Sequence, residues 1–232
     1  THSDETTSPQ LLRTNTSQVN DPIIVLSLGD SYASGESIEP FYGQNKKTLD
    51  KIKDEDWLAH RSTKSWSSMI RIPDEYGILS DCMSDHKIDN HRSSSANIQW
   101  YFVASSGATT EHIKKKSQRK DYKQMISYFD DISSLSQNDE VVYNRHGIRY
   151  VKGYKDLATQ LSVLSNINGE VDFVTLSIGG NDVNFAGIVK DGVVLSSRFI
   201  APNKLDNMMA ALWKNFHITR SNLVEVYKDI QD

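Results

Sequence analysis

The segment PIIVLSLG, residues 22–29, decides the fold, and it runs directly into DSYASGE, residues 30–36. Its nearly continuous apolar run, rich in branched residues and closed by a glycine, is typical of a strand buried on both faces of a parallel sheet. Two further segments share this character, residues 98–104 (IQWYFVA) and 171–178 (VDFVTLSI). Small or polar residues follow each of them instead of a hairpin turn, so we expect three parallel strands.

Apolar residues at helical spacing occur between and after these strands. They predict helices over residues 122–132, over residues 154–164 and over two stretches near the end, residues 205–216 and 223–230. Strands that alternate with helices form crossover units. We therefore expect an α/β fold in which helices cover both faces of a central parallel sheet.

Two insertions interrupt this alternation. Residues 36–97 form a long polar connection with one expected helix around residues 66–70. Residues 139–152 (DEVVYNRHGIRYVK) alternate around a His-Gly turn, which indicates an exposed hairpin. The basic residues within 114–120 are expected to form a solvated helix face, because the chain as a whole is acidic.

The composition is ordinary for a globular domain and excludes several classes of protein. The 232 residues carry a net charge of -4, with no basic field that would attract nucleic acid. The longest apolar run, residues 23–28, is too short to span a bilayer, so we expect no integral membrane segment. Residues 1–21 are rich in Ser, Thr, Asn and Asp and are expected to be a flexible lead-in to a domain over residues 22–232.

Cysteine and histidine usage argues against disulfides and metals. Cys82 is the only cysteine, so no disulfide forms within the chain. No grouping of His, Cys and Asp has the spacing of metal ligands, so we expect no metal ion and no cofactor.

Each expected strand ends in a polar cluster, where ligands bind in open parallel sheets. The clusters are residues 29–36 (GDSYASGE), 105–110 (SSGATT) and 179–182 (GGND). A serine held rigidly after a buried strand, with amide donors from two neighbouring strand ends, would stabilise the oxyanion of ester cleavage. Taken singly, each cluster is also what an ordinary strand-to-helix turn contains.

The combination of clusters resembles the signature of the SGNH/GDSL hydrolase family. GDSY at residues 29–32 is similar to its first block, Gly107 to the glycine of its second, and Asn181 within GGND to its third. The strings SLGDSYASGE and VTLSIGGNDVNF, and HRS at residues 60–62, resemble the bacterial secreted esterase and lipase branch. The resemblance runs from about residue 23 to the last expected helix.

This resemblance implies a three-layer, flavodoxin-like α/β/α fold and ester hydrolysis through an acyl-serine intermediate. It makes Ser31 the nucleophile and, through its own N–H, one oxyanion donor. The N–H of Gly107 and the side-chain amide of Asn181 become the other two donors, and Asp30 holds the nucleophile loop by hydrogen bonding. It also implies a secreted or cell-surface bacterial location and a small-molecule, lipid or carbohydrate ester as substrate.

The family's fourth block, Asp-x-x-His, is absent from the sequence. A serine hydroxyl needs an adjacent base, and no histidine here has an aspartate three residues before it. Thr109 stands there for His112, and Lys214 for His217. We therefore expect a fragment that is incomplete at its carboxyl end, completed by a C-terminal segment or a second chain.

Three alternatives remain open. A natural domain without a base would be a non-catalytic binding module. His217 could serve as base in an unusual geometry, although its apolar neighbours predict a partly buried histidine at a helix end. Four aromatic residues of the first insertion would stack on sugars in a carbohydrate O-deacetylase, or else anchor the loop. They are Phe41, Tyr42, Trp57 and Trp66.

Overall fold

The computed structural model describes residues 21–72, 77–82, 92–95, 97–128, 130–184, 187 and 202–231. The expected lead-in up to residue 20 lies outside the described residues, as do His2, His86 and His91.

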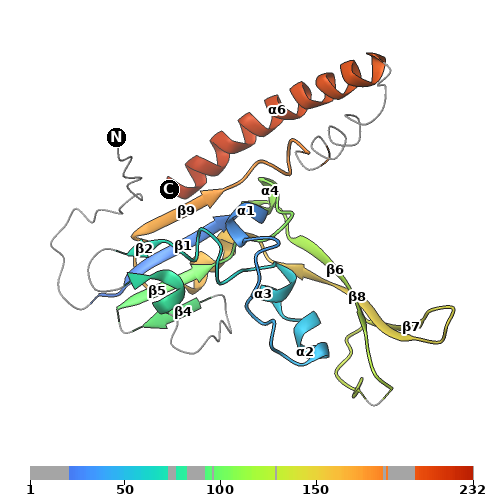
Figure 1. Cartoon of the computed structure of the whole chain (residues 1–232). Helices are drawn as coiled ribbons and strands as arrows, with labels where there is room; N and C mark the ends of the chain where they lie inside the picture. The colour runs from blue at the N-terminus through green and yellow to red at the C-terminus, as the bar shows by residue number, and fades with distance from the viewer. Residues whose placement is uncertain are drawn as a thin grey trace, which may run out of the picture.

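A four-stranded sheet forms the centre of the molecule (Figure 1). Its order is β4 (Arg92–Ser95), β5 (Ile98–Phe102), β1 (Ile23–Gly29) and β9 (Phe173–Ser177). β1 runs parallel to both β5 and β9, whereas the edge strand β4 is antiparallel to β5. The three expected parallel strands, and with them the α/β class, are confirmed. The edge strand β4, which belongs to the first insertion, was not expected.

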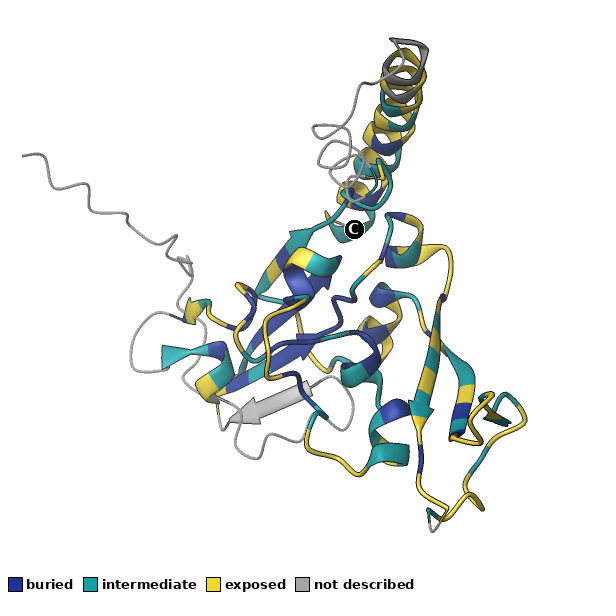
Figure 2. Cartoon of the chain, turned by 45° about the vertical axis from the view of Figure 1, so that its right-hand side comes forward, coloured by how far each residue is buried: buried dark blue, intermediate teal, exposed yellow. Residues whose placement is uncertain are grey.

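Both faces of the central sheet are covered, because alternate residues of its strands point to opposite sides. Val25 and Trp100 lie in a core on one face, and Leu26 and Tyr101 lie in a core on the other. The first core is closed by the insertion after β1, and the second by segments further along the chain. Figure 2 shows buried residues concentrated in the central strands. The covering residues are Ala33, Tyr42, Ile72 and Leu79 on the first face and Ile113, Val163 and Val226 on the second.

The insertion after β1 contains short elements and turns. They are α1 (Ser31–Ser34), α2 (Thr48–Ile52), α3 (Glu55–Leu58), β2 (Arg71–Ile72), β3 (Gly77–Ile78) and the 3-10 helix η2 (Leu79–Cys82). The helix expected around residues 66–70 is wrong, since this stretch forms turns. Ser65 organises one of these turns, because its hydroxyl accepts the amide of Ser68 and its carbonyl accepts the amide of Met69.

The helix expected over residues 122–132 is also wrong, because residues up to 125 form a strand. β6 (Gln118–Met125) pairs with β8 (Arg149–Leu157), which pairs in turn with β7 (Glu140–Tyr143). Residues of β6 alternate between more and less buried, so the period of two decides the structure although the few apolar residues also fit a helix. The expected hairpin over residues 139–152 is confirmed, with its turn at Asn144–Ile148.

The helix expected over residues 154–164 is replaced by two different elements. β8 continues to Leu157, and the 3-10 helix η3 (Gln160–Asn166) follows. Tyr154 pairs with Asp121 in β6, so pairing with a distant strand overrides the local helical spacing.

After β5 and β9 come the helices α4 (Glu111–Lys114) and α6 (Pro202–Gln231). α6 is one continuous helix where the spacing indicated two stretches. Lys114 pairs with Asp229 and Lys115 pairs with Glu225, so α4 holds the end of α6. The expected solvated helix face of residues 114–120 is therefore wrong in part: two of its lysines are paired with α6, and residues 118–120 belong to β6.

Candidate active site

Ser31 lies at the carboxyl end of the most buried strand. It is the first residue of α1, directly after the helix-capping residue Asp30. The Asp30 amide donates to Ser177 O of β9 at 2.8 Å, and its carboxylate accepts the Tyr32 amide at 3.1 Å. Ser31 is half-buried, and neither its hydroxyl nor its amide has a hydrogen-bond partner among the described residues. The fold thus holds the Ser31 side chain at the sheet edge and makes no hydrogen bond to its hydroxyl from the described residues.

The peptide before the nucleophile loop is clamped by a buried glutamine. Gln160 Oε1 accepts the Gly29 amide at 2.7 Å, and Gln160 Nε2 donates to Gly29 O at 2.8 Å. Gly29 has φ 136°, and a Cβ there would lie 2.2 Å from Ser177 O. Only glycine fits this close approach of two backbones. The clamp fixes the direction in which the chain enters Ser31.

The second cluster is joined to the first by the backbone. Ser105 N donates to Gly29 O at 3.0 Å, and Ser106 N donates to Ala59 O at 2.9 Å. Gly107 follows with φ 75° and is exposed. Its N–H has no acceptor among the described residues, so it is available as a donor.

The third cluster closes the arrangement. Asn181 Nδ2 donates to Ala108 O at 2.8 Å, next to Gly107. Asp182 accepts the amide of Thr110 at 3.0 Å and also its hydroxyl. The carboxylate of Asp30 accepts the amide of Gly180. The structure thus brings together the three loops that carry Ser31, Gly107 and Asn181, at the carboxyl ends of β1, β5 and β9.

Asp30 serves this arrangement as a buried hydrogen-bond acceptor. It is only 2% exposed, and burial raises the pKa of its carboxyl, while the amides of Tyr32 and Gly180 oppose that rise. The nearby charge of Asp182 adds to the rise. Asp30 lies between two loops, and its oxygens accept the amides of Tyr32 and Gly180; the resemblance implied this role for the nucleophile loop.

Sequence reasoning missed a group of charged side chains that borders the same loops. His60 Nδ1 lies 2.7 Å from Glu36 Oε2, and Glu36 also accepts a hydrogen bond from Ser106. Burial acts to raise the pKa of Glu36, but these two hydrogen bonds together with the charges of His60 and Lys120 outweigh it, and the pKa is lowered. Lys120 donates to Ser106 O, and burial lowers its pKa to about 8. Glu36 therefore links the nucleophile loop to the loop of Gly107.

The HRS segment, residues 60–62, supports the strand ends. Arg61 is 3% exposed; its Nη1 donates to Asp56 at 2.6 Å, and its Nε donates to Ala104 O at 2.9 Å. A buried guanidinium with a carboxylate partner and backbone acceptors is a rigid structural group. Arg61 therefore holds the segment that follows β5 and leads to Gly107.

Three of the four described histidines, His112, His146 and His217, do not supply an evident base. His217 is exposed in the middle of α6, beside Trp213 and Phe216, so the expectation of a partly buried histidine at a helix end is wrong. His112 Nδ1 accepts the Thr109 amide at 2.8 Å, and His146 is exposed in the hairpin turn.

The aromatic residues of the first insertion divide into two kinds. Tyr42 is buried edge-on against Trp100, and Phe41 is buried and stacked on His60, so both anchor the loop. Trp66 is 43% exposed. Within the described ranges, no three His, Cys, Asp or Glu residues gather as metal ligands. No described helix has the length and apolar character needed to cross a bilayer.

Comparison with known proteins gives no relative: no family model, no curated protein and no solved structure matches the chain.

Proposed function

We propose that this chain carries the nucleophile and the oxyanion donors of an SGNH-type serine ester hydrolase. The observation that supports the proposal is that the three strand-end loops carrying Ser31, Gly107 and Asn181 are joined to one another, with Asn181 hydrogen-bonded beside Gly107. The motif resemblance and this geometry point to the same three residues. The finer fold assignment, a flavodoxin-like α/β/α domain, belongs to the same proposal.

In this mechanism Ser31 Oγ attacks the ester carbonyl carbon while its proton passes to a base. The carbonyl oxygen becomes negative and accepts hydrogen bonds from three N–H donors. They are the amides of Ser31 and Gly107, which have no acceptor among the described residues, and Asn181 Nδ2. An amide NH₂ has two hydrogens, so Asn181 keeps a donor for the oxyanion while bonding Ala108. Loss of the alcohol gives the acyl-serine, which water hydrolyses.

A groove beside the third loop is evidence that the substrate has an apolar acyl group. Its volume is about 450 Å³ and its walls are mostly apolar. It starts at Gly180, next to Asn181, and continues along α6. Its lining residues include Ile178, Gly179, Val183, Phe216, Leu223 and Tyr227.

The presence of a catalytic base is what distinguishes a hydrolase from a non-catalytic binding module with the same pocket. The sequence has no Asp-x-x-His block, which favours the module for the chain alone. For the chain alone we therefore expect little or no turnover of p-nitrophenyl acetate. In the full-length gene product we expect turnover that Ser31→Ala abolishes, and an active Ser31→Ala protein would refute the assignment.

A carbohydrate O-deacetylase remains a second candidate within the same chemistry. Trp66, which is 43% exposed, is the feature that favours it. Release of acetate from acetylated xylan or chitin fragments by the full-length protein, lowered at least several-fold by Trp66→Ala, would support it. Equal rates in both proteins would assign Trp66 to another role.

A further inference from the structure

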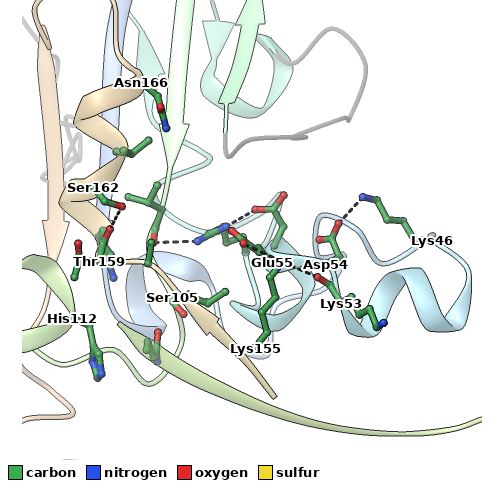
Figure 3. Close-up of a pocket in the computed structure, with 18 of the residues that line it drawn as sticks. Lys46, Lys53, Asp54, Glu55, Ser105, His112, Lys155, Thr159, Ser162 and Asn166 are labelled. Carbon is green, nitrogen blue, oxygen red and sulfur yellow. Dashed lines mark hydrogen bonds and ion pairs between the residues drawn. The ribbon is translucent and has the colours of Figure 1, made fainter. Parts of the chain in front are cut away.

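A polar cleft that Ser31 does not line lies beside the residues that follow β5. Its volume is about 450 Å³, within the range of small-molecule sites. None of Ser31, Gly107 and Asn181 lines it. Figure 3 shows Ser105, His112 and Thr159 on one side of this cleft and Lys46 and Asp54 on the other.

The lining of the cleft contains equal numbers of cationic and acidic side chains. Its cationic lining residues are Lys46, Lys53, Lys155 and Arg61, and its acidic lining residues are Asp50, Asp54, Glu55 and Asp56. Lys46 lies 2.6 Å from Asp54, and Lys155 lies 3.1 Å from Glu55. Arg61 is paired with Asp56, and Lys53 is paired outside the cleft with Asp139. With four cationic and four acidic side chains, the lining offers many donors and acceptors and no large excess of one charge.

The inner end of the cleft holds a polar group that the fold leaves unsatisfied. Ser105 is 2% exposed, and its hydroxyl has no hydrogen-bond partner among the described residues. A buried hydroxyl without a partner is costly to the fold, so one that lines a cleft points to a ligand or an ordered molecule that satisfies it.

A second donor at this end is uncharged. His112 Nδ1 accepts the Thr109 amide, which leaves the proton on Nε2. Burial, together with the charge of Lys116, lowers the pKa of His112 and keeps the ring neutral at neutral pH. No Phe, Tyr or Trp occurs among the described lining residues, so a ligand of this cleft would be held by hydrogen bonds and not by ring stacking.

We propose that this cleft binds a neutral saccharide unit, a ligand whose many hydroxyls both donate and accept. The proposal goes beyond ester hydrolysis and does not depend on it. The hydroxyl of Ser105 contacts a sugar hydroxyl at the inner end, and the paired lysines and carboxylates contact the others nearer the opening. For a single hexose in a polar site of this kind, we expect a Kd on the order of 1 mM.

Ligand-observed NMR with purified chain tests the proposal. The probes are methyl glucoside and methyl N-acetylglucosaminide, with the matching uronic acid, the amino sugar and inorganic phosphate as charged competitors. We expect saturation transfer to the neutral sugars and weaker transfer to the charged probes. No transfer to either neutral sugar at ten times the expected Kd, or tighter binding of a charged probe, would overturn the proposal.

The matched variants are Ser105→Ala and Ser165→Ala. Ser105→Ala removes a hydroxyl that bonds none of the residues that the structure describes, so the melting temperature should stay the same or rise. Sugar affinity should nevertheless fall roughly three- to tenfold, the scale of one neutral hydrogen bond. Ser165 lies on η3 outside the cleft, where its hydroxyl donates to Ser162 O, and its variant should bind sugar like the wild type. Unchanged affinity in Ser105→Ala would contradict the assigned contact.

Discussion

Asn181 Nδ2 lies 2.8 Å from the carbonyl oxygen of Ala108, so the loop after β9 is fastened to the loop after β5 beside Gly107. The two loops are 73 residues apart in the chain. This bond orients one N–H of the amide and leaves the second for a ligand. A side chain fixed in this way loses little freedom when charge develops on a substrate, which is the condition for an effective oxyanion donor.

Asn181→Ala should therefore lower ester turnover by the full-length protein by about 10²–10³. The matched control is Asp182→Asn, which keeps an oxygen acceptor for Thr110 and leaves the donor of Asn181 in place. We expect its rate to stay within a fewfold of the wild type. Initial rates with p-nitrophenyl acetate check both, and equal loss in the two variants would mean that the loop, rather than the amide, matters.

Gly29→Ala should prevent folding or destabilise the protein by more than about 3 kcal/mol. The new Cβ would overlap Ser177 O at 2.2 Å, and backbone cannot move aside cheaply. Gly147→Ala is the control, since Gly147 also has a positive φ but nothing lies within 4 Å of its Cβ position. Its cost should be only about 1 kcal/mol. Urea unfolding of both variants measures the difference, and similar losses would contradict the close approach of β1 and β9.

Asp30 should show opposite effects in two substitutions. Asp30→Ala removes the helix cap and the bond to Gly180, so it should cost about 1 kcal/mol or more. Asp30→Asn keeps an oxygen acceptor and cannot ionise. Because burial raises the pKa of Asp30, this residue stabilises the fold while protonated and loses that contribution as pH rises through the folded pKa. The melting temperature of Asp30→Asn relative to wild type should thus increase from pH 4 to pH 7.

Asp139 should make the second sheet sensitive to acid. Burial acts to raise the pKa of its carboxyl, but hydrogen bonds from Tyr122, Lys53 and Ser136 lower it to about 2. A depressed folded pKa gives stability that is present above the unfolded value of 3.8 and is lost as pH falls toward 2. The advantage of wild type over Asp139→Asn, at most about 2 kcal/mol at neutral pH, should therefore shrink between pH 4 and pH 2. An advantage that is constant over this range would contradict the contacts.

The parallel strands and their terminal clusters were predictable because each is a local pattern. Residues 23–29 are apolar except for Ser27 and the closing Gly29, which suits a strand between two parallel neighbours. The apolar side chains of residues 122–132 fit a helix, but residues up to 125 belong to β6, whose partner β8 lies some thirty residues away in the sequence. Only pairing with that partner makes it a strand.

The residues that support the candidate site could not be predicted from the sequence. Gln160 hydrogen-bonds the backbone of Gly29, which lies 131 residues away in the sequence. No local sequence pattern predicts that a glutamine makes this contact. Glu36 and His60 lie in two segments that carry the family resemblance, but their pairing depends on the path of the first insertion. Clusters at strand ends can be located from the sequence, whereas the contacts that make them rigid come from tertiary packing.

Labelling of the full-length gene product with a fluorophosphonate, followed by mass spectrometry of its peptides, tests the central claim most directly. The reagent forms a stable adduct only with a serine activated as a nucleophile. The account predicts one adduct on Ser31, formed more slowly in Asn181→Ala and absent in Ser31→Ala. An unmodified Ser31 in a protein that hydrolyses esters, or an adduct on a different serine, would contradict it.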